Sequence, residues 1–167
     1  MTRAAQNQQG AVQPPLPEWM IADLRESGIT PERAYELGWY PVSNDRYPEL
    51  LGFSVEGSAR FSDGYAIPYF DSETREPLRT PDGRPYVRVK LRVPVRSEGT
   101  KDGKVSKVKY LSPRGGGQHA YVLPQVHTWL RKGGKRTATV TEGEKKAVAA
   151  TDAGLPWTNS ADSPLTS

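Results

Sequence analysis

Cysteine is absent from this 167-residue chain, which excludes disulfides, thiolate-ligated zinc and a cysteine nucleophile. Histidine is almost as scarce, and neither His119 nor His127 has the serine or carboxylate neighbours that would predict a hydrolase. No apolar run approaches the roughly 20 residues that span a bilayer, and the polar start lacks the apolar core of a signal peptide. We therefore expect a soluble, cytoplasmic protein with no membrane partner.

Positive charge is concentrated in one part of the chain, although the net charge is only +4. Residues 75–136 contain 16 Lys or Arg and four Asp or Glu, which gives a local net charge of +12 and leaves −8 for the remainder. Such asymmetry indicates a polyanionic partner, while a simply solvated charged surface is the alternative interpretation.

The first part of the chain predicts a polar lead-in followed by two short helices. Residues 1–15 are rich in Gln, Ala and Pro and predict disorder. Pro17 and Gly28 bound one predicted helix, and Thr30 caps a second one that ends at Gly38. The two helices resemble a helix-turn-helix in outline, but neither has a basic recognition face, so packing is the favoured interpretation.

From residue 39 to 123 the pattern changes to short strands separated by turn signals. The predicted strands are ARF, GYAIPYFD, YVRVKLRVP, KVKYL and AYVLP, and their tight spacing favours an antiparallel meander or a small barrel. A helix over residues 125–132 and the opening of a βαβ unit follow. The expected fold class is α+β, with a lead-in at 1–15, a helical and β subdomain at 16–124, and a linker helix with an incomplete α/β unit at 125–167.

The strand YVRVKLRV alternates apolar and basic residues. Alternation places Arg88, Lys90 and Arg92 in a row on one face at a spacing of about 6.6 Å, which is close to the pitch of phosphates in a nucleic-acid strand. The adjacent loop KDGKVSKVK adds Lys101, Lys104, Lys107 and Lys109. Phosphate binding is the favoured interpretation, and a solvated face that protects the sheet is the alternative.

A glycine-rich segment, KYLSPRGGGQHAYV, follows the basic strands. Lys109, Tyr110 and Arg114 flank three consecutive glycines, a combination that suits a single nucleic-acid strand. No GK[ST] follows, so the segment is not a Walker loop. The glycines alone are equally consistent with a flexible connection.

An acidic turn, TVTEGEKK, provides the remaining chemical candidate. Glu142 ends a predicted apolar strand, which places its carboxylate where ligand sites of α/β domains lie, and Gly143 permits a sharp entry into the next helix. Glu144 complements the N-terminus of that helix. For this motif alone, a turn with helix capping is the simpler interpretation.

The order of these features resembles the RNA-polymerase domain of DnaG-like primases, particularly the primase-helicases of phages and plasmids. The resemblance covers residues 16–160 and is carried by SGIT, GYAIPYFDSETREP, RVKLR, KYLSPRGGGQHAYVLP and VTEGEKKAVAATDAG. It implies a nucleotidyltransferase of DNA replication whose basic face holds single-stranded template and primer. The implied template-binding residues are Arg88, Lys90, Arg92, Lys109 and Tyr110, to which the charge pattern adds Lys107 and Arg114. The resemblance also implies a TOPRIM unit in which Glu142 is the catalytic acid and a ligand of Mg²⁺.

The chain departs from that family in two respects. It contains no Asp-x-Asp pair, which a TOPRIM metal site requires, and the absence of cysteine excludes the family's zinc module. We therefore expect a primase fragment that binds template without synthesising primers, with a replicative helicase or other replication protein as a further partner. The alternatives are a stand-alone interaction or inhibitory module and an enzyme whose metal site is completed by another chain. An open sheet edge after Trp157 favours dimerisation.

Overall fold

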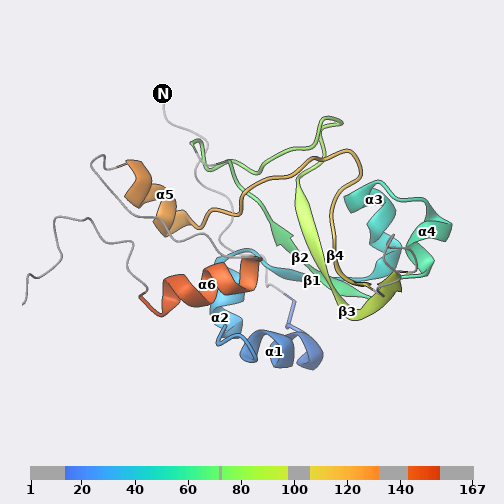
Figure 1. Cartoon of the computed structure of the whole chain (residues 1–167), viewed down its shortest axis with the longest axis horizontal. Coiled ribbons are helices and arrows are strands. Elements are labelled where there is room, and N and C mark those ends of the chain that lie inside the picture. The colour runs from blue at the N-terminus through green and yellow to red at the C-terminus, as the bar shows by residue number, and fades with distance from the viewer. Residues whose placement is uncertain (1–13, 72, 98–105, 132–142, 155–167) are drawn as a thin grey trace, which may run out of the picture.

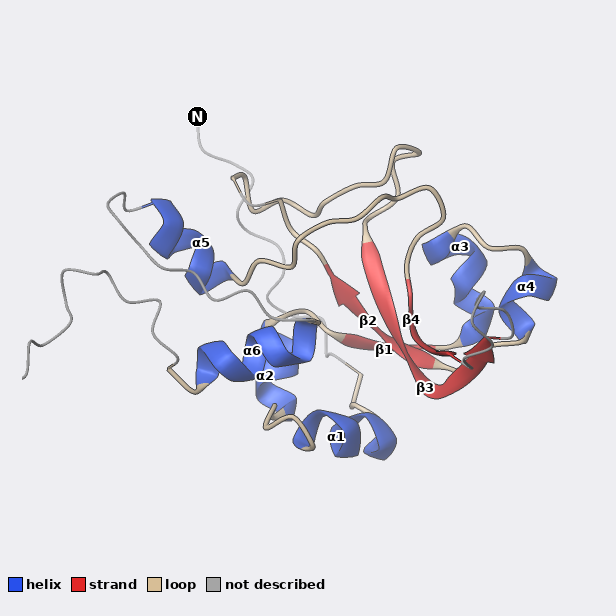
Figure 2. Ribbon diagram, viewed as in Figure 1, coloured by secondary structure: helices blue, strands red, loops and turns tan. Residues whose placement is uncertain are grey.

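The protein is described here from a computed structural model that covers residues 14–71, 73–97, 106–131 and 143–154. Four strands form one antiparallel sheet in the order β1-β2-β3-β4, with helices on both sides (Figures 1 and 2). The strands are β1 (Tyr40–Val42), β2 (Gly64–Pro68), β3 (Val87–Ser97) and β4 (Ser106–Leu111). The α+β class and the antiparallel β module predicted from the sequence are thereby confirmed.

Two short helices open the fold as the capping signals predict. Helix α1 spans Glu18–Arg25 and helix α2 spans Pro31–Glu36. The Thr30 hydroxyl accepts a hydrogen bond of 3.2 Å from the backbone N–H of Arg33, which satisfies one of the free donors at the start of α2.

Between β1 and β2 the chain forms helical turns rather than the strand expected for ARF. These are η1 (Asn44–Arg46), α3 (Tyr47–Leu51) and α4 (Val55–Ala59). Ser54 caps α4 by accepting a hydrogen bond from the Gly57 N–H, so ARF becomes the end of that helix and the turn after it. The strand prediction failed because local capping outweighed the strand propensity of three residues.

The sheet separates two apolar cores. Alternation in β2 turns Tyr65 and Ile67 toward α1 and α2, and turns Ala66 toward α3. Figure 1 shows α1, α2 and the later helix α6 (Glu144–Asp152) gathered on one side, with α3 and α4 on the other. The segment AYVLP is not a strand but a loop that crosses the core beside α1 and α2. Leu123 of this loop is buried, and the Tyr121 hydroxyl accepts a hydrogen bond from the Trp39 indole.

Close packing of β2 against β3 requires a glycine at position 64. A Cβ atom there would lie 2.4 Å from the backbone oxygen of Lys90 and 2.7 Å from a methyl group of Val89. The Lys90 backbone could move away from such a Cβ only by breaking the hydrogen bonds between β2 and β3. Gly64 therefore helps to set the position of the basic strand β3.

The C-terminal part described is helical. Helix α5 spans Pro124–Arg131, as predicted, and α6 follows Gly143, whose φ of 87° gives the predicted sharp entry. Val148 of α6 is buried in the core that also contains α1, and Arg33 of α2 forms a 3.0 Å ion pair with Asp152. The predicted strands on either side of α6, including the edge after Trp157, lie outside the described residues, so the TOPRIM-like unit stays a prediction.

Candidate nucleic-acid interface

The basic residues of β3 lie on a sheet face that helices cover. Arg88 is opposite Ile67 and Lys90 is opposite Tyr65, both of which belong to the core under α1, α2 and α6. The predicted row of cations therefore faces the helices, and only Arg92, farther along β3, is exposed.

Arg88 is engaged by a carboxylate from the far end of the sequence. Its guanidinium donates a 2.7 Å hydrogen bond to Oε1 of Glu144, and the Tyr69 hydroxyl donates to the same oxygen at 2.6 Å. The Glu144 side chain is only 1% exposed, whereas that of Arg88 is 28% exposed. The sequence pattern assigned Glu144 to a helix terminus; the tertiary structure makes it a buried partner of β3.

Lys90 is engaged in the same way by Asp23 of α1. The Asp23 carboxylate accepts hydrogen bonds from Lys90 at 2.9 Å, from Lys145 at 3.0 Å and from the Tyr65 hydroxyl at 2.9 Å. Burial alone would raise the pKa of Asp23, but these three donors outweigh it and hold the pKa below its usual value of 3.8. Asp23 is therefore ionised at neutral pH and offsets one of the two positive charges of Lys90 and Lys145.

Two ion-paired groups, one around Glu144 and one around Asp23, lie side by side because Glu144 and Lys145 are adjacent in the chain, and together we call them the inner polar cluster. Three cations and two carboxylates give it a net charge of +1, and it ties β3 to both α1 and α6. Its members are Asp23, Arg88, Lys90, Glu144 and Lys145.

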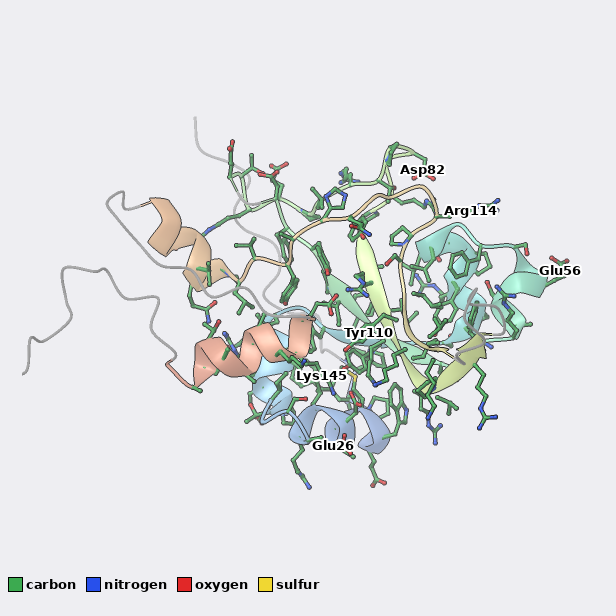
Figure 3. All side chains as sticks on the ribbon, viewed as in Figure 1. Glu26, Glu56, Asp82, Tyr110, Arg114 and Lys145 are labelled. Atoms are coloured by element: carbon green, nitrogen blue, oxygen red, sulfur yellow. The ribbon has the colours of Figure 1, made fainter. Side chains whose placement is uncertain are left out.

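Tyr110 of β4 lies at the margin of the inner polar cluster. The Arg88 guanidinium carbon lies 4.9 Å from the centre of the Tyr110 ring, and Lys90 is its cross-strand neighbour. Figure 3 labels both Tyr110 and Lys145, which lie on the side of the molecule that carries α1 and α6. Burial, followed by the negative charge of Glu144, raises the pKa of Tyr110 to about 12, so its hydroxyl keeps its proton at neutral pH and can donate a hydrogen bond.

A second group of cations remains open to solvent on β3 and β4, and we call it the outer basic set. None of its members takes part in the ion pairs found among the described residues. The sheet register places Arg96 directly opposite Lys107, an arrangement of like charges that destabilises a strand pair unless an anion compensates. The outer basic set consists of Arg92, Arg96, Lys107 and Lys109, all exposed.

The structure separates Arg114 from the other predicted residues. Its backbone N–H donates to the Leu51 carbonyl at 2.8 Å, which ties this loop to the end of α3. Figure 3 shows Arg114 near the turn that carries Asp82, on the α3 side of the molecule. The glycines after it form a turn against Tyr86, because a Cβ on Gly116 would lie 2.9 Å from that ring.

No metal site can be assembled from the described residues. They contain no group of three or more His, Asp or Glu side chains placed to hold a metal ion, and Glu142 lies outside them. A Mg²⁺ site of the TOPRIM type needs several carboxylates, and this sequence contains no Asp-x-Asp pair, so such a site stays a prediction that rests on Glu142 alone. Within the described ranges, no helix has the length and apolar character needed to cross a membrane.

Comparison of the chain with family models, with curated proteins and with solved structures found no significant match. The interface therefore has to be interpreted from its own geometry. Sequence patterns singled out Tyr110 and five cations of this region, but not Arg96, Lys145, the carboxylate of Asp23 or Trp19, the aromatic neighbour of Arg92. Trp19 and Asp23 are four residues apart, so they lie one turn apart on the same side of a helix, and this spacing is the sequence signal that could have brought both to notice.

Proposed function

We propose that this chain binds single-stranded nucleic acid, as the template-binding part of a DNA primase of the DnaG-like type. The observation that carries the proposal is the outer basic set, whose four exposed cations have no carboxylate partner among the described residues. Phosphate groups are the ligand that such a set suits best, because each phosphate neutralised releases a counterion.

Arg96 and Lys107 lie directly opposite each other on β3 and β4, which favours an anionic ligand between them. Two cations at directly opposed positions repel each other in the free protein, and a phosphate between them would convert that repulsion into attraction. A sheet selected only for solubility favours mixed charges at such a pair. Phosphate contact therefore supplies a physical reason for the arrangement.

The two groups of cations take different roles in this proposal. Arg92, Lys107 and Lys109 contact phosphate together with Arg96, whereas Arg88 and Lys90 hold α1 and α6 against β3. Primer synthesis is not part of the proposal, because the sequence lacks the carboxylates that nucleotidyl transfer at a TOPRIM site would need.

Salt dependence of binding is the test. Fluorescence anisotropy would follow a labelled single-stranded DNA of roughly 16 nucleotides, the upper end of site sizes for one binding module. Four phosphate contacts predict a slope of log K against log salt of about −3, and a loss of affinity of roughly 50-fold between 50 and 200 mM salt. Arg96→Gln with Lys107→Gln is expected to weaken binding and to reduce the slope by about 1.4.

The matched control carries the same change in charge at two exposed cations that do not belong to the outer basic set, Arg25→Gln with Arg79→Gln. This control is expected to retain the wild-type slope. If both double variants lose the same affinity, the protein responds only to its net charge. If the wild type binds no oligonucleotide at low salt, the proposal is wrong and a protein partner becomes the better hypothesis.

A further inference from the structure

Three aromatic rings are stacked from the core of the protein to its surface beside the outer basic set. Trp39 stacks on Tyr65 with ring centres 5.8 Å apart and planes 19° apart, and Tyr65 stacks on Trp19 at 6.3 Å and 29°. Trp39 and Tyr65 are fully buried, whereas Trp19 on α1 is half-buried. The stack therefore ends at a half-buried Trp that lies next to Arg92.

Arg92 lies at the solvent end of this stack. Its guanidinium carbon is 5.7 Å from the centre of the Trp19 ring, and the side chain is exposed. Among the described residues no ion pair involves Arg92, and the contact found for its side chain is the cation–π contact with Trp19. A planar cation of β3 and an indole ring of α1 are thus placed together beside the outer basic set.

We infer that Trp19 and Arg92 form a nucleobase-stacking site, which a base of the bound single strand enters. This inference rests on the proposed function and adds what the phosphate contacts cannot provide, namely selection of an unpaired strand. Bases in a duplex have both faces covered, so only a strand with free bases can stack on an indole or a guanidinium plane.

The packing beneath Trp19 supports the assignment. A hydrogen bond to Asp23 fixes the Tyr65 side chain, and the Tyr65 ring packs against the Trp19 ring. Because the ring is already held in place, a base can stack on it without the entropy loss of ordering a free side chain. The planar guanidinium of Arg92 can stack on a base while it also contacts a phosphate. A lysine at that position could contact the phosphate but has no planar group to stack.

The test compares two ligands of equal charge: a single-stranded oligothymidylate and an abasic oligonucleotide of the same length. Wild-type protein is expected to bind the thymidylate roughly 5- to 160-fold more tightly, since stacking of one base has that value. Trp19→Leu should remove this preference and leave affinity for the abasic strand within about twofold, while Trp19→Phe should restore most of it. Arg92→Lys, which keeps the charge, should reduce the preference in the same way.

Photo-crosslinking with a 5-bromouracil oligonucleotide gives a second measurement on the unmodified protein. The adduct is expected on the peptide that contains Trp19, and an adduct only on other aromatic residues would overturn the inference. Equal wild-type affinity for the two oligonucleotides would also overturn it while leaving phosphate binding intact. Failure to bind either ligand would overturn this inference and the proposed function together.

Discussion

Removal of Arg88 should destabilise the protein strongly, because it would leave the buried carboxylate of Glu144 with only the Tyr69 hydroxyl as a donor. Loss of one partner from a buried ion pair costs about 3–5 kcal/mol. Arg88 is 28% exposed, so water can partly replace it, and we expect a loss of about 3 kcal/mol for Arg88→Met. For a chain of this length that corresponds to a fall in melting temperature of about 6–12 °C.

A double-mutant cycle separates the ion pair from general packing. Once Glu144 is replaced by Gln no buried charge remains, so the combined variant should be more stable than the sum of the two single changes predicts, by about 2 kcal/mol. Urea unfolding followed by circular dichroism gives the four free energies. Arg92→Met is the control, with a loss under about 1 kcal/mol expected for an exposed cation–π contact. Additivity within about 0.5 kcal/mol would show that Arg88 and Glu144 do not act as a pair.

Three further predictions concern the same region. Tyr69→Phe removes the 2.6 Å hydrogen bond to Glu144 and should cost about 1–3 kcal/mol in urea unfolding; an unchanged midpoint would contradict the bond. Gly64→Ala introduces a Cβ 2.4 Å from a backbone oxygen and should cost about 1–3 kcal/mol or more, whereas Gly28→Ala, which has free space but a left-handed backbone, should cost about 1 kcal/mol. Asp23 has a lowered pKa in the folded protein, so its stabilising contribution is complete above the unfolded-state pKa near 3.8 and is lost as the pH falls through the folded-state pKa. Asp23→Asn should therefore flatten the acidic part of a profile of unfolding free energy measured from pH 5 to pH 2. A variant profile identical to that of the wild type would contradict the lowered pKa.

Sequence patterns predicted the fold class and most of the element order because those features depend on local signals. The Thr30 cap, the turn at Gly28 and the two-residue alternation of β3 are encoded within a few residues. The same local signals failed at ARF and AYVLP, where Ser54 capping and the crossing of the core determined the conformation. Short segments carry too little propensity to outweigh such contacts.

The sequence by itself determined which residues of β3 and β4 are basic and that Arg88, Lys90 and Arg92 would share a face. Only the tertiary structure decided which of them remain open to a ligand. Asp23 lies 67 residues from Lys90 in the chain and Glu144 lies 56 residues from Arg88, so no local pattern could reveal that these carboxylates neutralise them. The charge that a surface presents is set by long-range pairing of side chains, and that pairing exists only once the helices have packed against the sheet.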